Sequence, residues 1–575
     1  MSLDIEISKD GYKILVENID GKKKYLGNKY NQKKEIIKFI DKFNNNIEKD
    51  NYIVFGLFFA EHIQELLKAI SLKSRILIVE YNLEIVDLCK NDDELKKILD
   101  NPQVNLALAD SDIEGFFKQY INENNVANLK IEEYCSYYSI YKEYLYDKYT
   151  LIKQEITRIT LNRNTILEVC DIFFDNFLGN LKYLAKATPV NVLKDKYKGI
   201  PAIIVSAGPS LGKNIDYLKK SHSGLVLSGG RTLRTLIEKD IIPDCVGSVD
   251  FSEYAFRLVN GYLNKFDIPL VVSDKTNAKI LEEHSGDKFF FSDSEFLNEI
   301  WKKDIMQLFG GGSIAHALTL LALYMGCNPV VFIGQDLAYT DEQEHYVLAE
   351  NTWERPIDEK LFKDISDVYV QDINGKLVRT SVQLNDYRFS LEKIIKDNPN
   401  TTFINATEGG ANIKGAINML FKDVVKEFQE VDIESMSSYS DNSDKTKEII
   451  RKLQESNRNI KKYINLCKEG IEISRAWKID YNMKNCLNLR IYEEKLRKLD
   501  EKFTSDLKYI KIVNPILTQI ACDIQNNKNF IINSSDNLEV KLRKNIYRLY
   551  EVYSQIMEVF QVSYTKIEMV IENLK

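Results

Sequence analysis

Glycine and small polar residues follow an apolar run at residues 208–212, which read Gly-Pro-Ser-Leu-Gly just before a helix predicted to begin near Lys213. Glycine lets the backbone approach a ligand closely, and a helix start offers free N–H groups and a positive dipole end to an anion. A phosphate would fit there. A tight strand-to-helix turn with Ser210 as the helix cap explains the same residues.

A second glycine-rich segment, Gly310-Gly311-Gly312-Ser313, precedes an apolar helix predicted over 314–325. Its glycines again permit close backbone approach, and Ser313 could cap the helix or bind a ligand oxygen. Two such segments in one sheet favour a nucleotide. His316 lies one turn into this helix among apolar residues, so we expect it to be packed rather than catalytic.

A carboxylate, phenols and an imidazole follow the apolar run 330–333, at Asp336, Tyr339 and His345. Acid–base chemistry is expected beyond strand ends of this kind, so this segment is the predicted active centre. The alternative is that Asp336 only caps the next segment and His345 lies in a loop.

A fourth polar segment, residues 405–415, follows the short apolar run 402–404, and its Glu408 could line a pocket or only a turn. Acidic-x-acidic pairs such as Asp110/Asp112 and Asp293/Glu295 carry little information. With 85 acidic residues in 575, about 13 such pairs arise by chance. The sequence therefore predicts no metal site.

Regularly spaced strands must position these segments. Apolar runs alternate with helix-length segments at 202–205, 225–227, 246–249, 270–272, 289–291 and 330–333. This alternation predicts a mostly parallel sheet with helices on both faces, which binds ligands at the carboxyl ends of its strands. Further polar runs at those ends begin at Ser228, Asp250 and Ser273.

The N-terminal part predicts a smaller α/β domain. Alternation over residues 3–16 predicts an antiparallel meander, and residues 52–80 predict a β-α-β unit. Glu80 at its second strand end could hold a ribose hydroxyl, against the alternative of a solvated carboxylate. From about Ile131 the pattern is helical and tyrosine-rich until Pro189.

The C-terminal part predicts helices only. Residues 431–444 are rich in Ser and Asp, as in a linker, and apolar residues beyond them recur at three-four spacings. We therefore expect an N-terminal α/β domain (1–188), a central α/β domain (189–430), a linker (431–444) and an all-α bundle (445–575).

Composition excludes several classes of protein. A net charge of -7 without a long basic run makes nucleic acid a poor partner. The start of the chain lacks a secretory signal, and no run of about 18 apolar residues occurs, so we expect a cytoplasmic protein without membrane contact. Eight cysteines without any C-x-x-C pair predict neither disulfides nor zinc.

Together these segments resemble the motility-associated factor (Maf) family of flagellin glycosyltransferases. The resemblance rests on residues 206–211, 233–250, 311–313, 334–339 and 407–411, in that order and spacing. It covers about residues 200 to 420, and Tyr25-Leu26-Gly27-Asn28-Lys29-Tyr30 resembles a short family motif. The central domain of the family is similar to bacterial sialyltransferases.

The resemblance implies transfer of a nonulosonic acid, such as pseudaminic or legionaminic acid, from its CMP donor to Ser or Thr hydroxyls of flagellin. No resident cofactor is implied, and a monophosphate leaving group favours a metal-independent reaction. Asp336, His345 and Glu408 are the implied candidates for the catalytic base. The implied nucleotide and donor contacts are Ser206, Gly208, Pro209, Ser210, Leu211, Gly230, Arg231, Asp250, Gly312, Ser313, Gln335, Tyr339, Thr407, Gly409 and Gly410.

The sequence departs from the family pattern at two strand ends: Phe251 stands where the family pattern has proline, and Gly230-Arg231 replaces a smaller polar pair. Two other functions remain open. A pterin-type pyrophosphokinase using ATP and magnesium shares a similar central domain, but would not need the helical module. A non-catalytic flagellin-binding chaperone would not need glycines at every strand end. If flagellin is the acceptor, we expect the helical bundle to recognise it.

Overall fold

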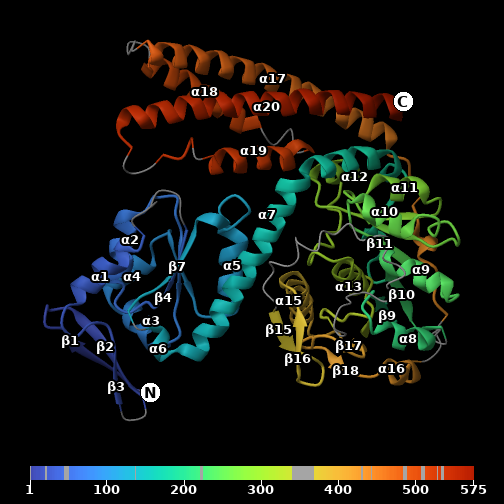
Figure 1. Cartoon of the computed structure of the whole chain (residues 1–575), viewed down its shortest axis with the longest axis horizontal. Coiled ribbons are helices and arrows are strands. Elements are labelled where there is room, and N and C mark those ends of the chain that lie inside the picture. Colours follow the sequence, from blue (N-terminus) through green and yellow to red (C-terminus); the bar gives the residue numbers. More distant parts are fainter. Residues whose placement is uncertain are drawn as a thin grey trace. The chain divides into compact units, whose positions relative to one another are not determined.

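The computed structural model describes residues 2–19, 22–43, 51–135, 137–219, 224–339, 368–428, 432–441, 443–483, 489–506, 512–527, 529–532 and 536–575. Backbone contacts divide the chain into two compact units (Figure 1). Unit 1 comprises residues 1–168 with 518–549, and unit 2 comprises 169–517 with 550–575. The domain boundaries expected from composition remain predictions.

Unit 1 begins with the predicted antiparallel meander. Strand β1 (Ser2–Ile7) pairs with β2 (Lys13–Ile19), which pairs with β3 (Lys22–Leu26). Leu15 and Leu26 on this meander are fully buried in the core of the unit. The alternation of the sequence is thus confirmed as a sheet with one packed face.

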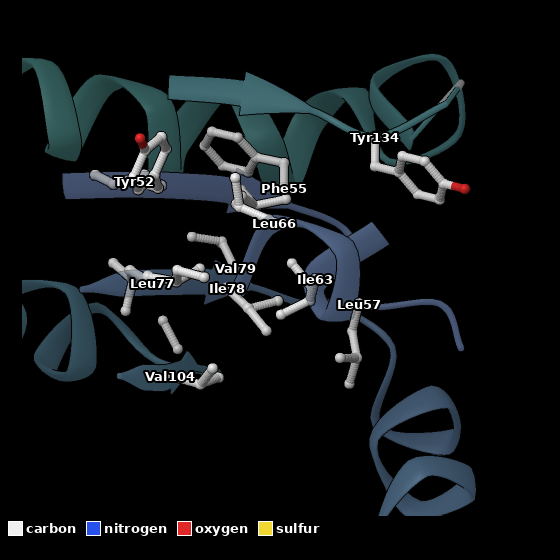
Figure 2. Packing of buried hydrophobic residues seen from close by; sticks show 14 of the residues in the cluster. Tyr52, Phe55, Leu57, Ile63, Leu66, Leu77, Ile78, Val79, Val104 and Tyr134 are labelled. Carbon is white, nitrogen blue, oxygen red and sulfur yellow. The ribbon is translucent and has the colours of Figure 1, made fainter. Parts of the chain in front are cut away.

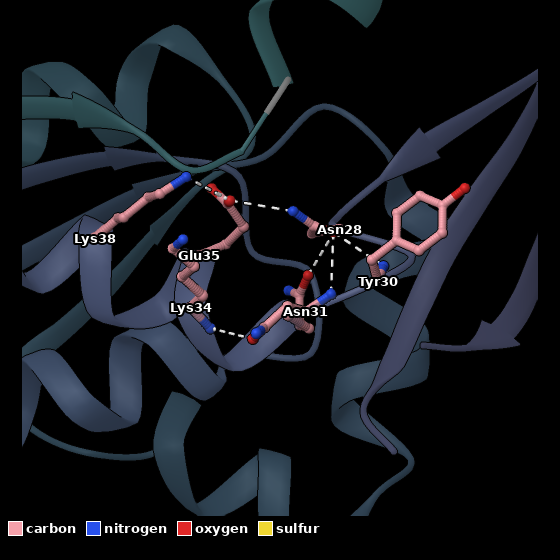
Figure 3. A network of polar contacts seen from close by, with 7 residues as sticks. Asn28, Tyr30, Asn31, Lys34, Glu35 and Lys38 are labelled. Atoms are coloured by element: carbon pink, nitrogen blue, oxygen red, sulfur yellow. Dashed lines mark hydrogen bonds and ion pairs between the residues drawn. The ribbon is translucent and has the colours of Figure 1, made fainter. Parts of the chain in front are cut away.

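The motif at residues 25–30 shapes the turn from β3 into helix α1 (Gln32–Asp41). Asn28 Oδ1 accepts hydrogen bonds from the backbone N–H groups of Tyr30 (2.9 Å) and Asn31 (3.1 Å). Its Nδ2 donates to Glu35 Oε1 at 3.1 Å, as Figure 3 shows. The side chain of Asn28 therefore joins the turn to the first part of the helix.

The rest of the N-terminal segment of unit 1 is a Rossmann-like layer in which four parallel strands follow the order β6-β5-β4-β7. The strands β4 and β5 are buried along their whole length, and Figure 2 shows their apolar side chains packed in the core. The elements are β4 (Asn51–Phe55), α2 (Glu61–Ala69), β5 (Ile76–Val79), α3 (Leu83–Lys90), α4 (Asp93–Leu99), β6 (Val104–Ala107), α5 (Asp110–Tyr120) and β7 (Leu129–Glu133).

The expected helical start at Ile131 is wrong. Ile131 lies in β7 and pairs with Ile53 of β4. The side chains of β7 are mostly only half-buried, so the strand can contain charged residues such as Lys130 and Glu132. These residues interrupt the apolar pattern by which a strand is predicted. Helical structure begins later, with α6 (Tyr137–Ile140) and the long α7 (Lys142–Leu184), whose helical dihedrals break at Val169.

Unit 2 is built on a nine-stranded parallel sheet in the order β18-β17-β14-β9-β10-β11-β12-β13-β8. All six predicted apolar runs are strands of this sheet. The strands are β8 (Thr188–Pro189), β9 (Ala202–Val205), β10 (Leu225–Gly229), β11 (Cys245–Ser248), β12 (Leu270–Ser273), β13 (Lys288–Phe291), β14 (Val330–Ile333), β17 (Phe403–Asn405) and β18 (Ile417–Asn418).

The strand order places a switch in chain direction at the centre of the sheet. From β9 the chain runs outward through β10, β11, β12 and β13, then returns to place β14 on the other side of β9. Connections from β9 and β14 therefore leave in opposite directions along the sheet. In open α/β sheets this is the place where ligands bind, outside the carboxyl ends of the strands.

Helices cover this sheet, and a two-stranded hairpin of β15 (Val368–Gln371) and β16 (Leu377–Thr380) accompanies it (Figure 1). Helix α13, predicted over 314–325, runs from Ile314 to Tyr324 and packs against β9, β10 and β11. The other helices are α8 (Leu211–Leu218), α9 (Gly230–Glu238), α10 (Glu253–Val259), α11 (Ala278–Glu283), α12 (Glu295–Trp301), α15 (Val382–Asp397) and α16 (Phe421–Glu427).

The C-terminal part is helical, as predicted, with α17 (Thr446–Asn482), α18 (Leu489–Asp506), α19 (Asn514–Asn526) and α20 (Leu538–Leu574). Within unit 2, a Cβ on Gly470 of α17 would lie 2.7 Å from the ring of Tyr553 in α20. None of the helices in the described ranges is both long and apolar enough to cross a membrane.

The Ser/Asp-rich segment packs on the central sheet instead of running free. Met436 is buried in the core of unit 2. The backbone N–H of Asp441 donates to Thr188 Oγ1 at 2.7 Å, and Ser440 Oγ donates to Asp287 Oδ1 at 2.9 Å. These contacts fix the described part of the segment, 432–441, to the edge formed by β8 and β13.

Candidate functional site

The loop after β9 and the loop after β14 meet at the switch point of the sheet. Asp336, three residues after β14, turns its carboxylate into the β9–α8 loop and accepts a hydrogen bond from Ser210 Oγ at 2.7 Å. The Ser210 backbone N–H lies 3.3 Å from the same carboxylate oxygen. Ser210 is thus not the expected side-chain cap of α8, because its hydroxyl serves Asp336.

This arrangement changes the interpretation of the helix start. The backbone N–H groups of Gly208 and Ser210 donate to Gly334 O and to Asp336, respectively. Those of Leu211 and Gly212 donate to the carbonyls of residues 208 and 209. The anion held at the start of α8 is therefore the carboxylate of the chain itself.

Three glycines permit these two loops and the loop after β17 to approach one another so closely. A Cβ on Gly208 would lie 2.0 Å from Asp336 Oδ2 and 2.5 Å from Gly334 O. Gly334 (φ +63°) and Gly410 (φ +74°) adopt left-handed backbone, and a Cβ on either would lie 2.1 Å from a backbone oxygen, of Ser206 and Asp336 respectively. Only glycine fits these positions without displacing the backbone.

Asp336 is 1% exposed, and burial raises the pKa of its carboxyl. The hydrogen bonds from Ser210 and the nearby charge of Lys213 lower the pKa, but burial is the largest influence. Asp336 Oδ1 is buried and has no hydrogen-bond partner among the described residues. A carboxyl with a raised pKa, and with one oxygen that has no hydrogen-bond partner among the described residues, is suited to accept a proton or a hydrogen bond from a hydroxyl group.

Side chains from three neighbouring strand ends are joined beside Asp336. Ser206 Oγ donates to Gln335 Oε1, and the backbone N–H of Gln335 donates to Thr407 Oγ1 at 3.1 Å. These residues follow β9, β14 and β17. The structure thus brings together Ser206, Gln335 and Thr407, which the sequence places up to 201 residues apart.

Glu408 lies at the edge of this group. Its Oε1 accepts a hydrogen bond from Asn214 Nδ2 at 3.0 Å, and its backbone carbonyl accepts one from Lys213 Nζ at 2.9 Å. Both partners belong to α8. Glu408 therefore joins the β17 loop to α8 and does not contact Asp336 through a hydrogen bond that the structure describes.

The triple-glycine segment packs closely around a buried histidine. His316 is fully buried, its Nε2 lies 2.8 Å from the Tyr387 carbonyl, and its Nδ1 accepts from the Ser313 N–H at 3.2 Å. Burial lowers the pKa of His316. A Cβ on Gly311 would lie 2.6 Å from the His316 ring, and one on Gly312 would lie 2.7 Å from Tyr387. The expectation of a packed His316 is confirmed.

The next strand ends along the edge carry Arg231 and Asp250. Helix α9 begins at Gly230 directly after β10, and Arg231 donates from Nη1 to Tyr254 Oη at 3.2 Å. Asp250 is exposed, and its Oδ1 accepts from the Ser252 N–H at 2.8 Å. The start of α9 therefore combines the positive end of the helix dipole with the Arg231 guanidinium, and it follows β10, the strand next to β9.

Of the two remaining residues of the predicted active centre, the structure describes Tyr339 but not His345. The Tyr339 N–H donates to the Arg379 carbonyl at 2.8 Å, and the Arg379 guanidinium lies 4.8 Å from the Tyr339 ring centroid. Tyr339 is thereby joined to strand β16 of the hairpin. His345 lies outside the described residues.

The polar run that the sequence predicts at the end of β12 is joined in the structure to polar residues at the end of β13. Asp274 is fully buried, and its carboxylate accepts from Ser292 Oγ at 2.6 Å and Ser273 Oγ at 3.2 Å. Lys275 Nζ forms an ion pair of 2.8 Å with Asp293 Oδ1. Burial raises the pKa of Asp274. Its sequence signal, polar residues directly after two apolar runs, is present at both positions.

The N-terminal Rossmann-like layer uses its strand-end carboxylate internally. Glu80 is fully buried, so the alternative of a solvated carboxylate is wrong. The carboxylate accepts from the backbone N–H groups of Leu57, Tyr81 and Asn82, each at 2.8 Å, and from Tyr137 Oη. The carboxylate of Glu80 therefore accepts hydrogen bonds from four donors of the chain itself and holds the turn after β4. These contacts take the place of the predicted hydrogen bond to a ribose hydroxyl.

Among the described residues, no group of three or more His, Cys, Asp or Glu side chains is placed to hold a metal ion.

Comparisons with known proteins agree with this architecture. The family model described as 6-hydroxymethylpterin diphosphokinase MptE-like matches residues 175–342. No curated protein sequence matches the chain. A solved Maf glycosyltransferase from Magnetospirillum magneticum AMB-1 is similar over 100% of this chain and 93% of its own, with a TM-score of 0.57 and 14% identity. The α/β fold expected from the Maf resemblance is thus confirmed.

Proposed function

We propose that the protein is a glycosyltransferase that moves a nonulosonic acid from its CMP-activated form to Ser or Thr hydroxyls of flagellin. The observation that carries the proposal is the convergence of the Maf-like segments at the switch point, where Asp336 meets the Ser206–Ser210 loop. The similarity of the whole chain to a Maf glycosyltransferase supports it further.

The sheet edge suggests how such a donor would lie. The start of α8 is taken by Asp336, so we place the donor phosphate at the start of α9, where Gly230 and Arg231 follow β10. The sugar would then lie towards β9 and β14, facing Ser206 and Asp336. The cytidine would lie towards Gly312 and Ser313 and the strands beyond β10.

The reaction requires the chain to stabilise the leaving phosphate and to accept a proton. The bond between the anomeric carbon and the phosphate oxygen breaks, and CMP leaves with the electron pair. A new bond joins that carbon to the acceptor oxygen, whose proton passes to a base. Arg231 and the α9 dipole would stabilise the leaving phosphate, and Asp336 would take the proton, with Glu408 or His345 as the alternatives.

Binding of CMP should exceed binding of ATP, because the Maf resemblance implies a cytidine donor. Calorimetry with the full chain tests this preference. Tight magnesium-dependent ATP binding without any response to CMP would favour the pyrophosphokinase. The family model described as 6-hydroxymethylpterin diphosphokinase MptE-like matches only residues 175–342, less than a third of the chain, and does not favour that alternative.

Flagellin isolated from cells that contain the protein should be heavier by one or more nonulosonic acid residues than flagellin from cells that lack it. Intact-mass measurement of the two preparations decides this point. Equal masses would remove flagellin as the acceptor, and flagellin binding without a mass difference would favour the chaperone. We assign recognition of the acceptor to the C-terminal helices, because a small donor does not require a helical module.

A further inference from the structure

An exposed aromatic ring lies beside the ends of β12 and β13, beyond the residues assigned to the phosphate. Phe309 is 46% exposed and immediately precedes the glycine segment 310–312. Its ring packs edge-on against Phe291, the last residue of β13, with centroids 5.2 Å apart. The buried Phe291 therefore supports Phe309 from one side, while much of the ring stays open to solvent.

A charged pair stands next to this ring. Lys275 Nζ lies 5.9 Å from the Phe309 ring centroid and pairs with Asp293 Oδ1 at 2.8 Å. The side chains of Lys275 and Asp293 are 27% and 46% exposed, so both polar ends can reach a ligand. The buried Asp274, held by Ser292, anchors the turn that carries Lys275.

We propose that Phe309 and the Lys275–Asp293 pair form the subsite for the cytosine base, the ring stacking on Phe309 and its edge meeting the pair. This assignment rests on the proposed function, which supplies a CMP donor. Neighbouring parallel strands are about 4.8 Å apart, so β12 lies roughly 10 Å from β10. The subsite therefore lies on the cytidine side of the phosphate placed at Arg231.

The hydrogen-bonding groups of Lys275 and Asp293 are complementary to the edge of cytosine but not to that of uracil. Cytosine presents an amino donor at N4 beside acceptors at N3 and O2. The second oxygen of Asp293 can accept from N4, and the remaining hydrogens of Lys275 can donate to N3 or O2. Uracil presents a carbonyl oxygen where cytosine has the amino group, which would face the carboxylate of Asp293.

The test uses the full chain, with CMP, UMP, AMP and ribose 5-phosphate titrated by calorimetry. Phe309→Ala should weaken CMP binding about tenfold to a hundredfold, the usual range for one base stacked on an aromatic ring, and leave ribose 5-phosphate binding unchanged. Asp293→Asn should reduce the preference for CMP over UMP about tenfold, because the amide can donate to the uracil oxygen.

Phe266→Ala is the matched control. Phe266 is similarly exposed, at 40%, but it precedes β12 and therefore lies near the amino ends of the strands, opposite the candidate site at their carboxyl ends. Its loss should leave all four affinities unchanged. If Phe309→Ala melts at a much lower temperature than the parent, Phe309→Leu keeps the apolar contact with Phe291 and should still lose most of the stacking.

The possible results distinguish a failure of the proposed function from a failure of the cytosine subsite alone. A parent protein that does not bind CMP would overturn the proposed function and this subsite with it. A parent that binds CMP, together with a folded Phe309→Ala that binds it equally well, overturns the subsite alone. An unchanged ratio of CMP to UMP affinity in Asp293→Asn overturns the role of the pair. Tighter binding of AMP than of CMP by the parent would assign the ring to adenine.

Discussion

Gly208→Ala should lower the rate of sugar transfer about a hundredfold or more. The new Cβ would lie 2.0 Å from Asp336 Oδ2 and 2.5 Å from the Gly334 carbonyl, so one of the two loops must move. Displacement of a reacting group by about 1 Å can cost a hundredfold in rate. CMP binding should change far less, because we place the phosphate at α9. Transfer assays at saturating donor, with calorimetry of CMP, measure both effects.

Gly212→Ala is the control for this change, because Gly212 lies four residues further along the chain in the same glycine-rich segment. No atom lies within 4 Å of a Cβ built on Gly212, and the residue is already in α8. Alanine should therefore leave transfer unchanged and stabilise the helix by up to about 1 kcal/mol. Equal transfer rates for Gly208→Ala and the parent would show that close approach of the two loops has no role in the reaction.

The sequence predicts the strands of unit 2 well, because buried parallel strands appear as short continuous apolar runs. Runs such as 202–205 and 330–333 are buried at every position, so their pattern is unmistakable. Short or mixed strands are different. Strand β8 has only two residues, and β7 carries charged side chains that are mostly half-buried, so neither strand shows a clear apolar pattern in the sequence.

The candidate site shows a similar division. The glycine-rich segment that begins at Gly208 is recognisable as a place of close backbone approach, but the atoms that Gly208, Gly334 and Gly410 approach depend on the strand order. Ser210 and Asp336 are 126 residues apart, and their hydrogen bond exists because β14 returns to the side of β9. Local spacing carries no information about that return. The expectation of a free helix start at α8 therefore overlooked the carboxylate that already occupies it.

Asp336→Asn should lower the rate of transfer by about a hundredfold to ten-thousandfold, the range expected when a general base is removed. The amide keeps the shape of the side chain and can still accept from Ser210 through its oxygen. It cannot take up a proton. Thermal melts should show a folded enzyme, because the contacts to the β9–α8 loop are retained.

The dependence on pH offers an independent readout of the same residue. Burial raises the pKa of Asp336, and a base acts only in its ionised form. The parent rate should therefore fall as pH is lowered through that raised pKa, starting above the range of an ordinary carboxyl. The Asp336→Asn enzyme should lack this fall. A dependence that persists in the variant would belong to another group.

Ser210→Ala separates a base from a residue that only holds the loop. The variant removes the 2.7 Å hydrogen bond to Asp336 but leaves the carboxylate in place. If Asp336 acts only by holding Ser210, Asp336→Asn keeps that hydrogen bond and should leave transfer nearly unchanged, whereas Ser210→Ala should show the loss. If Asp336 is the base, Asp336→Asn should cost far more than Ser210→Ala. A folded Asp336→Asn enzyme working within about threefold of the parent would remove Asp336 from the proton transfer, since loss of a general base costs at least a hundredfold. The large loss should then appear in His345→Ala or Glu408→Gln.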